Sequence, residues 1–296
     1  MATLKDVKRI VIKVGTSTLT HHTGKSNIRQ IKKLVAVISD IVNSGVEVAL
    51  VTSGAIGVGV GKLGLRDRPT NTAGKQAAAT IGQCELMFMY DKMFAEFGHT
   101  VGQFLITKRD VDNDECRENL INAFEKTFEY GAIPIINEND AVAVEEIVFG
   151  DNDSLSAIVA KLIKADALLI LTDIDGLYTD DPRTNPAARF VHTVNRIDEE
   201  LEKMGKGAGS AVGTGGMATK IEAAKIATEA GADMVIANGD NIYAINDIMA
   251  GKKVGTLFLA KNHRYDGENE LGPERDAYRM ERRLKRNIQY RMAVGK

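Results

Sequence analysis

The chain has 296 residues, of which 44% are hydrophobic and 26% charged, values typical of a globular protein that buries a full apolar core. Its 38 basic and 40 acidic residues give a net charge of -2, which argues against a dedicated nucleic-acid-binding protein. No apolar run has the length of a membrane span or a signal peptide, and Cys84 and Cys116 have no metal-ligand spacing, so we expect a cytoplasmic protein with reduced thiols.

Short runs of β-branched residues alternate along the chain with longer segments of helical periodicity. Strands are predicted at residues 9–14, 46–52, 100–106, 132–136, 167–171 and 234–237. Helices are predicted at residues 28–42, 74–97, 115–130, 155–164 and 217–230, the first with Asn27 as its N-cap and Gly45 as its stop signal. Strands separated by helices favour right-handed crossovers and a mainly parallel sheet covered on both faces, which places the chain in the α/β class.

The last part of the chain changes in character. No repeat or flexible linker divides residues 1–260, which we expect to form one domain, whereas residues 261–296 form a tail that is first polar and then rich in charge. Pro273 suits the first turn of a helix in this tail. Asp276 and Glu281 interrupt its basic residues, which favours a solvated helix packed on a neighbouring subunit over a nucleic-acid-binding segment.

Small polar residues follow the predicted strands at the points where the strands end. Ligands bind beyond the carboxyl ends of the strands in an open parallel sheet, and hydrogen-bonding residues at those ends suit a ligand with many oxygen atoms. The residues concerned are Gly15, Thr16 and Ser17 after the first strand, Thr52, Ser53 and Gly54 after the second, residues 137–140 after the strand at 132–136, and Thr172 and Asp173 after the strand at 167–171.

A glycine-rich loop precedes the helix predicted at residues 217–230. Gly215 and Gly216 allow the backbone to approach a ligand closely, and the N–H groups of a helix N-terminus favour an anion. Lys220 adds a positive charge suited to phosphoryl oxygens. A loop of this kind is as often a flexible connection, so both interpretations stay open. Residues 59–64 match the dinucleotide pattern G-x-G-x-x-G, but they do not directly follow a strand and we discount the match.

Three polar residues, Asp151, Asn152 and Asp153, stand just before the apolar helix predicted at residues 155–164. One of them would serve as a helix cap, since Asp and Asn are favoured there and a carboxylate suits the helix dipole. Three in succession after Gly150 exceed what a cap requires. The pattern alone leaves a capping role and a functional role equally open.

Taken together, these motifs resemble the amino acid kinase family. The runs that carry the resemblance are KVGTS at residues 13–17, SGA at 53–55, INEND at 136–140, GDND at 150–153, LTDIDGLY at 171–178 and GGMATK at 215–220. They occur in the order typical of the family and cover the chain from about residue 8 to residue 259. The pairing of NEND with GDND points to the branch of the family that acts on glutamate.

The resemblance implies a three-layer α/β/α sandwich with a mainly parallel central sheet. It also implies that a phosphoryl group passes from ATP to the side-chain carboxylate of L-glutamate, giving glutamyl 5-phosphate and ADP in the first step of proline biosynthesis. Mg²⁺ would accompany the nucleotide and be held mainly by it, without a metal site formed by the protein.

The resemblance also assigns roles to individual residues. Lys13, Asp153 and Lys220 would act in catalysis, with Asp153 orienting the two lysines. Ser53, Asp140 and Asn152 would hold the glutamate. ATP would be bound by Lys13, Thr172, Asp173, Thr214, Gly215, Gly216, Met217, Ala218, Thr219 and Lys220.

The chemistry of this reaction agrees with the residue types. A glutamate side chain has an ordinary pKa of about 4.3, so it is already an anion at neutral pH and needs no general base. The reaction instead requires charge neutralisation and alignment of two anions, which Lys13, Lys220 and a metal ion would supply. An ordinary surface position is the alternative interpretation for Lys220, and it is weak for Lys13 because an apolar strand precedes it.

The family resemblance carries further expectations. It implies a homo-oligomer, either dimer or tetramer, feedback inhibition by proline, and a reductase partner of the glutamate-5-semialdehyde dehydrogenase type. Residues 140–150 are our hypothesis for the proline sensor, because they adjoin the glutamate residues. We expect no C-terminal domain of the type found in RNA-modifying enzymes, which many bacterial members of this branch carry.

Other activities fit the same fold. The acceptor is alternatively N-acetylglutamate, aspartate, carbamate or a nucleoside monophosphate. A regulatory protein that binds nucleotide without turnover is a further alternative, against which the intact Lys13, Asp153 and Lys220 argue.

Overall fold

The computed structural model describes residues 4, 7–21, 23, 25–143, 152–180, 185–199, 201–202 and 216–263. The predictions made for Asp151, Thr214 and Gly215, for most of the proline-sensor segment and for the tail beyond residue 263 lie outside these ranges. The division into a domain at residues 1–260 and a tail therefore stays a prediction.

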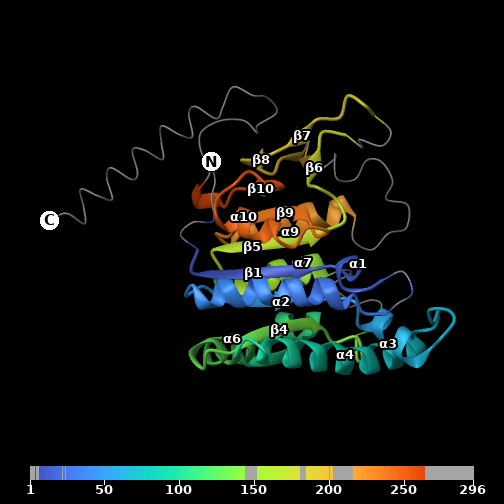
Figure 1. Cartoon of the computed structure of the whole chain (residues 1–296). Helices are drawn as coiled ribbons and strands as arrows, with labels where there is room; N and C mark the ends of the chain where they lie inside the picture. The colour runs from blue at the N-terminus through green and yellow to red at the C-terminus, as the bar shows by residue number, and fades with distance from the viewer. Residues whose placement is uncertain are drawn as a thin grey trace.

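A mainly parallel sheet forms the centre of the described residues (Figure 1). Its eight strands run in the order β3-β4-β2-β1-β5-β9-β10-β8, and each neighbouring pair is parallel except β9 and β10. A separate two-stranded ribbon pairs β6 with β7. The strands are β1 (Arg9–Val14), β2 (Glu47–Val51), β3 (Val101–Ile106), β4 (Ile133–Glu138), β5 (Ala167–Thr172), β6 (Leu177–Tyr178), β7 (Phe190–Val191), β8 (Thr193–Val194), β9 (Asp233–Asn238) and β10 (Thr256–Phe258).

Helices cover both faces of this sheet. They are α1 (Thr16–Leu19), α2 (Ile28–Asn43), α3 (Ala55–Leu63), α4 (Thr72–Ala95), α5 (Lys108–Asp112), α6 (Asp114–Glu129), α7 (Asn152–Leu162), α9 (Met217–Glu229) and α10 (Ala244–Met249), with a 3-10 turn η1 at Lys261–His263. The three-layer α/β/α sandwich implied by the sequence is confirmed.

Strand β1 shows why two apolar cores form. Successive side chains of a strand point to opposite faces, so Ile10 and Ile12 enter one core and Val11 enters the other. The first core contains apolar residues of α2, α4 and α10, and the second contains those of α6, α7 and α9. A central strand buried on both faces reads as a continuous apolar run, which is why β1 and β5 were predictable.

The predicted elements lie within a few residues of those observed. Asn27 caps α2 by accepting a hydrogen bond from the backbone N–H of Gln30, and Gly45 follows the helix with φ of 92°. The helix predicted from residue 155 begins at Asn152, so that Asn152 and Asp153 form part of its first turn. Helix α3 and the short elements α1, α5, α10, β6, β7, β8 and β10 were not predicted, because they are short or, for α3, interrupted by glycines.

Strand register brings several strand ends to one edge of the sheet. Lys13 on β1 lies opposite Val51 on β2 and Ile170 on β5, and Val51 in turn lies opposite Ile136 on β4. The residues that follow these positions therefore gather side by side. Helices α1 and α3, which follow β1 and β2, lie together at this end of the sheet in Figure 1.

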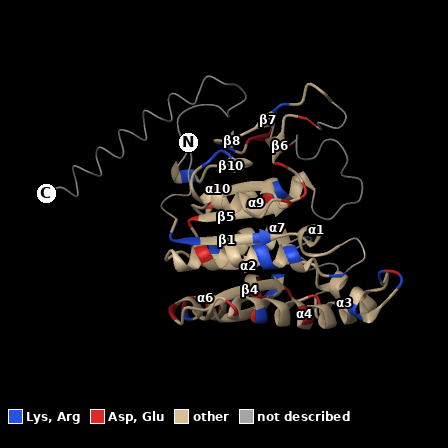
Figure 2. Ribbon diagram, viewed as in Figure 1, with Lys and Arg blue, Asp and Glu red and all other residues tan. Residues whose placement is uncertain are grey.

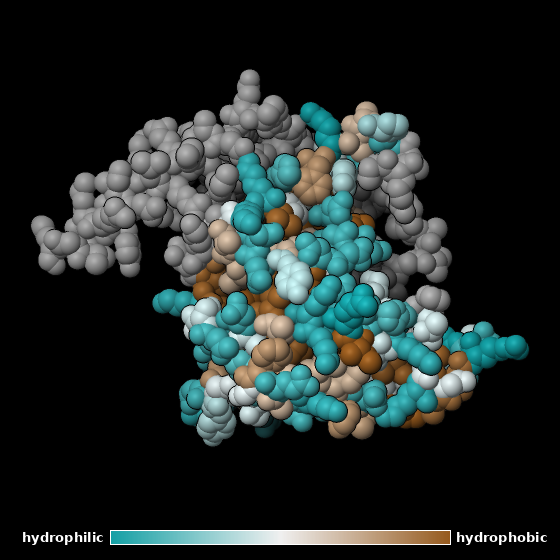
Figure 3. Space-filling view, in the orientation of Figure 1, coloured by the Kyte–Doolittle hydropathy of each residue, from teal (hydrophilic) through white to brown (hydrophobic). Residues whose placement is uncertain are grey.

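The outer surface carries charges of both signs. Figure 2 shows basic and acidic residues interspersed along the helices and loops, and the face seen in Figure 3 is covered mainly by hydrophilic side chains with smaller apolar areas between them. Among the described residues, no helix combines the length and apolar character needed to cross a membrane.

Candidate active site

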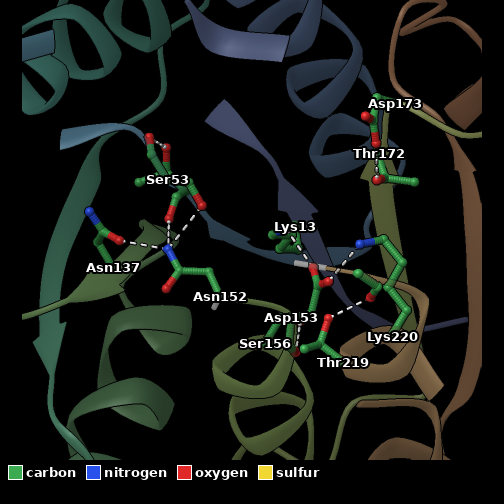
Figure 4. Close-up of polar contacts among 12 residues, drawn as sticks. Lys13, Ser53, Asn137, Asn152, Asp153, Ser156, Thr172, Asp173, Thr219 and Lys220 are labelled. Atoms are coloured by element: carbon green, nitrogen blue, oxygen red, sulfur yellow. Dashed lines mark hydrogen bonds and ion pairs between the residues drawn. The ribbon is translucent and has the colours of Figure 1, made fainter. Parts of the chain in front are cut away.

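Two lysines meet one carboxylate where β1 ends (Figure 4). The Lys13 Nζ lies 2.5 Å from Oδ1 of Asp153, and the Lys220 Nζ donates a hydrogen bond of 2.9 Å to Oδ2 of the same side chain. Strand β1 supplies Lys13, the first turn of α7 supplies Asp153 and the first turns of α9 supply Lys220. All three side chains are buried: Lys13 is 7% exposed, Lys220 3% and Asp153 0%.

The charge state of Asp153 follows from these contacts. Burial by itself would raise the pKa of Asp153, but the attraction and hydrogen bonds of the Lys13 and Lys220 ammonium groups outweigh it and lower the pKa below its ordinary value. One carboxylate between two ammonium groups leaves the cluster with one excess positive charge. A buried, excess positive charge is a site that favours an anion such as a transferring phosphoryl group.

Asn152, the neighbour of Asp153, joins a second cluster. The two hydrogens on its Nδ2 are shared among three acceptors, which are the backbone oxygen of Thr52 at 2.5 Å, Oγ of Ser53 at 3.0 Å and Oδ1 of Asn137 at 2.8 Å. These three acceptors follow β2 or end β4, which are adjacent strands. Figure 4 shows Ser53, Asn137 and Asn152 together on one side and the Lys13–Asp153–Lys220 cluster on the other.

A glycine forms the tight turn that follows Ser53. Gly54 is the N-cap of α3 and has φ of 91°, a conformation that side-chain-bearing residues rarely adopt. A Cβ at Gly54 would also lie 3.4 Å from Cγ2 of Thr16, in the segment that follows Lys13's strand. The turn therefore holds the start of α3, with its N–H groups, close to the end of β1.

Asp140 follows β4, but no hydrogen bond joins it to Ser53 or Asn152 within the part of the chain that the structure describes. Burial raises the pKa of this carboxyl, and the Arg68 charge opposes that rise. The structure thus places Asp140 at the same strand end as Asn137, without joining it to the cluster of Asn152.

The residues predicted to bind nucleotide lie farther along the same edge. Thr172 ends β5 and is buried, its Oγ1 donates to Oδ1 of Asp173 at 3.0 Å, and its backbone oxygen accepts from the N–H of Gly239 at 2.7 Å. Gly216 is the N-cap of α9 and its oxygen accepts from Oγ1 of Thr219 at 2.7 Å. Met217 and Ala218 form the first turn of that helix, so their backbone N–H groups lie at its positive end.

Sequence reasoning missed Asn137 as a site residue. In the NEND run the sequence pattern assigned the substrate-binding role to Asp140, whereas Asn137 is the residue that contacts Asn152. The signal was present, because Asn137 is the first polar residue after the apolar part of β4 and is 2% exposed in the structure. A buried amide at a strand end must be hydrogen-bonded to a partner, and here the partner lies in the site.

Among the described residues, no group of three or more His, Cys, Asp or Glu side chains is placed to hold a metal ion. Both oxygens of Asp153 are taken by lysines, so this carboxylate is unsuited to bind Mg²⁺ directly.

Comparison with known proteins adds to this geometry. The model of the amino acid kinase family matches residues 8–238. The glutamate 5-kinase of Clostridium perfringens is 53% identical over 262 residues, which cover 87% of this chain and 97% of that protein. The glutamate 5-kinase of Clostridium acetobutylicum is 54% identical over 259 residues, which cover 88% and 97%.

A solved structure has the same fold at low sequence identity. The UMP kinase of Bacillus anthracis gives a TM-score of 0.58 at 17% identity, and the match covers 86% of this chain and 97% of that one. Identity this low supports the shared fold alone.

Proposed function

This chain belongs to the amino acid kinase family, and we propose that it transfers the γ-phosphoryl group of ATP to the side-chain carboxylate of L-glutamate. The products are glutamyl 5-phosphate and ADP, in the first step of proline biosynthesis. The observation that carries the proposal is that Asn152 and Asp153, consecutive residues of α7, enter two different polar clusters. One cluster suits an amino acid and the other a phosphoryl group.

The order of the strands supports a division of labour along the edge of the sheet. Residues assigned to the acceptor follow β4 and β2, Lys13 stands on β1, and Thr172 ends β5. Adjacent strands lie about 4.8 Å apart, so an acceptor on β4 and β2 and a nucleotide on β5 meet over β1. Lys13 thereby stands between the attacking oxygen and the nucleotide.

The reaction needs little acid–base chemistry from the protein. An oxygen of the ionised glutamate side chain attacks the γ-phosphorus of ATP, a new P–O bond forms, and the bond from that phosphorus to the bridging oxygen breaks, with ADP leaving. No proton is transferred in this step because the attacking carboxylate is already deprotonated at neutral pH. What the protein supplies is alignment and positive charge.

Lys13 and Lys220 supply the positive charge. Each is held by one oxygen of Asp153 and therefore stays in place when the two anions approach. Fixed charges in a site with little water stabilise developing charge without having to reorient. The N-terminus of α9, with Gly216 to Thr219, adds backbone N–H groups directed at phosphate oxygens.

Mg²⁺ is proposed as the partner of ATP. The described residues form no group of three or more His, Cys, Asp or Glu side chains that could hold the metal, so it would reach the site on the nucleotide phosphates. There it would neutralise phosphate charge beyond what the two lysines offset.

The assay that tests the proposal measures ADP release by the purified chain with ATP and Mg²⁺ in the presence of L-glutamate, N-acetylglutamate, aspartate, carbamate or UMP. Trapping with hydroxylamine, which converts an acyl phosphate to a hydroxamate, identifies the product in the same samples. We expect turnover and hydroxamate with L-glutamate. Turnover only with another acceptor would contradict the choice of substrate, and ATP binding without any turnover would favour a regulatory protein.

Several finer features belong to the same proposal. The product is a mixed anhydride of a carboxylic and a phosphoric acid, which water hydrolyses. This lability supports a reductase partner that consumes the product promptly.

Feedback inhibition by proline is supported by the resemblance between proline and the cyclised carbon skeleton of glutamate. A homo-oligomer is supported by exposed large apolar side chains, among them Phe88 on α4 and Tyr243 at the N-cap of α10. The two free cysteines, Cys84 and Cys116, agree with a cytoplasmic location.

A further inference from the structure

A buried glutamine on α4 has a donor for which the described residues offer no partner. Gln83 is 8% exposed, its Oε1 accepts a hydrogen bond of 2.9 Å from Nδ2 of Asn137, and its buried Nε2 has no hydrogen-bond partner among the residues that the structure describes. Burying an amide donor without a partner is costly, and most proteins avoid it. A glutamine retained at such a site therefore calls for an explanation beyond packing.

The hydrogen bonds around Asn137 can be assigned without ambiguity from the backbone. The N–H of Glu138 can only donate, and it lies 2.9 Å from Oδ1 of Asn137. Oδ1 must therefore be the acceptor, which turns Nδ2 of Asn137 toward Gln83. Because Nδ2 is a donor, the atom of Gln83 that faces it must be Oε1.

The same logic extends from Asn137 to Asn152. The backbone oxygen of Thr52 can only accept, so the atom of Asn152 beside it is Nδ2, which also donates to Oδ1 of Asn137. Three protein acceptors thus surround Nδ2 of Asn152, and its Oδ1 points away from Ser53 in Figure 4. An oxygen presented in this way suits a ligand donor, and the α-ammonium group is the charged donor of an amino acid.

We propose that Gln83 is a positioning residue for the acceptor amino acid, acting through Asn137 to fix the amide of Asn152 with its oxygen toward the substrate. The inference rests on the proposed function and names a residue outside the set assigned to it. Without the acceptor at Gln83, the Asn137 amide loses one of the three contacts that hold its orientation, the one made by its Nδ2. A rotated Asn137 would set Nδ2 against Nδ2 of Asn152 and against the N–H of Glu138.

The packing of α4 on α3 places Gln83 for this role. Its neighbour Gly82 has no room for a side chain, since a Cβ there would lie 1.7 Å from the backbone oxygen of Ala55. This close backbone contact fixes the position of α4 relative to the first residue of α3. Helix α3 begins directly after Ser53 and Gly54. The glutamine therefore sits on a rigid element rather than on a loop.

The test compares wild-type protein with Gln83→Met, which keeps a similar volume but removes the amide. We expect the KM for L-glutamate to rise by at least about fivefold, with the KM for ATP and kcat within about twofold of wild type, because the change acts on one substrate only. The control is Leu86→Val on the same helix, a fully buried apolar residue. It should lower the thermal unfolding temperature and leave both KM values unchanged.

Each outcome decides one point. An unchanged KM for glutamate in Gln83→Met would overturn the inference, as would a parallel rise in both KM values or an equal rise in Leu86→Val. Absence of glutamate turnover in the wild-type protein would instead contradict the proposed function, and with it the inference. If the wild-type protein phosphorylates glutamate and Gln83→Met has the same KM for glutamate, the inference fails while the proposed function stands.

Discussion

The ammonium groups of Lys13 and Lys220 share a single carboxylate, that of Asp153, although one lysine stands on the first strand and the other on a helix near the end of the described chain. The distances from Nζ to the nearer oxygen are 2.5 Å for Lys13 and 2.9 Å for Lys220. An ammonium carries three N–H donors, so one carboxylate contact fixes its position while preserving its charge. The shared carboxylate therefore joins the positive charge on β1 to the positive charge on α9, the two charges that we propose act in phosphoryl transfer.

Replacing Lys220 tests the charge directly. Lys220→Met keeps a flexible apolar chain of similar length but removes one of the two positive charges, and we expect kcat to fall by at least about a hundredfold. Steady-state ADP release measures it. The control is Lys225→Met on the same helix, because Lys225 is exposed and pairs with Glu202 at the surface. We expect kcat of this control within about twofold of wild type, since an exposed pair contributes little.

A near-normal kcat in Lys220→Met would mean that Lys220 serves only to hold Asp153. In that case the substitution would lower the free energy of unfolding and leave kcat nearly unchanged.

Asp153→Asn should damage both catalysis and stability. The neutral amide leaves two buried ammonium groups without a counter-charge, and breaking a buried pair in this way costs about 3–5 kcal/mol of unfolding free energy. We also expect kcat to fall by about a hundredfold or more, because the lysines lose their fixed positions. Urea unfolding and steady-state kinetics of the same preparation measure the two effects. Asp247→Asn, which breaks a surface pair with Lys252, is the matched control and should change neither.

The stability effect of Asp153 should depend on pH in a defined direction. The folded-state pKa of this carboxyl is lowered from an ordinary value of 3.8, so the stabilisation is complete above pH 3.8 and is lost as pH falls through the lower, folded-state pKa. The difference in unfolding free energy between wild type and Asp153→Asn should therefore be constant near neutrality and shrink below pH 3.8. A difference that stays constant down to the acid limit of folding would contradict the lowered pKa.

The sequence predicted most strands and long helices of the fold well. It also named some of the residues that meet in the candidate site. Long apolar strands and periodic helices were readable because burial on two faces, or on one stripe, repeats at a fixed period. The strands of the sheet core follow from that rule, whereas the N-cap of α2 follows from the preference of Asn for helix starts. The antiparallel strand β10 was not predicted, because its residues Thr256–Phe258 are too few to show any period.

Contacts between distant segments are what the sequence leaves undetermined. Asn152 and Asp153 looked like a helix cap as much as a site, and only the fold shows that they enter two clusters built from different strands. Gln83 lies in the middle of an Ala-rich helix, where a glutamine is unremarkable by propensity. Only the folded structure shows that Gln83 is buried and that its side chain accepts a hydrogen bond from Asn137 on β4.

Asp140 offers a test of function against stability. Burial raises the pKa of this carboxyl, so the folded state binds its proton more tightly than the unfolded chain does. Stability therefore falls as pH rises from 3.8 through the raised pKa, and at neutral pH the charged form costs folding free energy. We expect Asp140→Asn to be as stable as wild type, or more stable, in urea unfolding at pH 7 without ligand.

The same variant should bind the acceptor poorly. If Asp140 contacts the α-ammonium of glutamate, losing that charged hydrogen bond raises the KM for glutamate by at least about tenfold and leaves the KM for ATP unchanged. A variant that is both less stable and normal in its KM for glutamate would show that Asp140 has a structural role instead.

The crossing of α3 and α4 yields a prediction with a control on the same helix. A Cβ at Gly59 would lie 1.8 Å from the backbone oxygen of Ala78, a neighbour that cannot rotate away, whereas a Cβ at Gly57 would have Cγ2 of Thr16 at 3.9 Å as its nearest neighbour. Gly59→Ala must push the helices apart, which typically costs about 1–3 kcal/mol or more. Gly57→Ala should instead gain about 0.5–1 kcal/mol, since alanine stiffens a helix. Thermal and urea unfolding measure both. Because α4 carries Gln83, we also expect the displaced helix in Gly59→Ala to raise the KM for glutamate. Equal stability of Gly59→Ala and Gly57→Ala would contradict the close packing of α3 on α4.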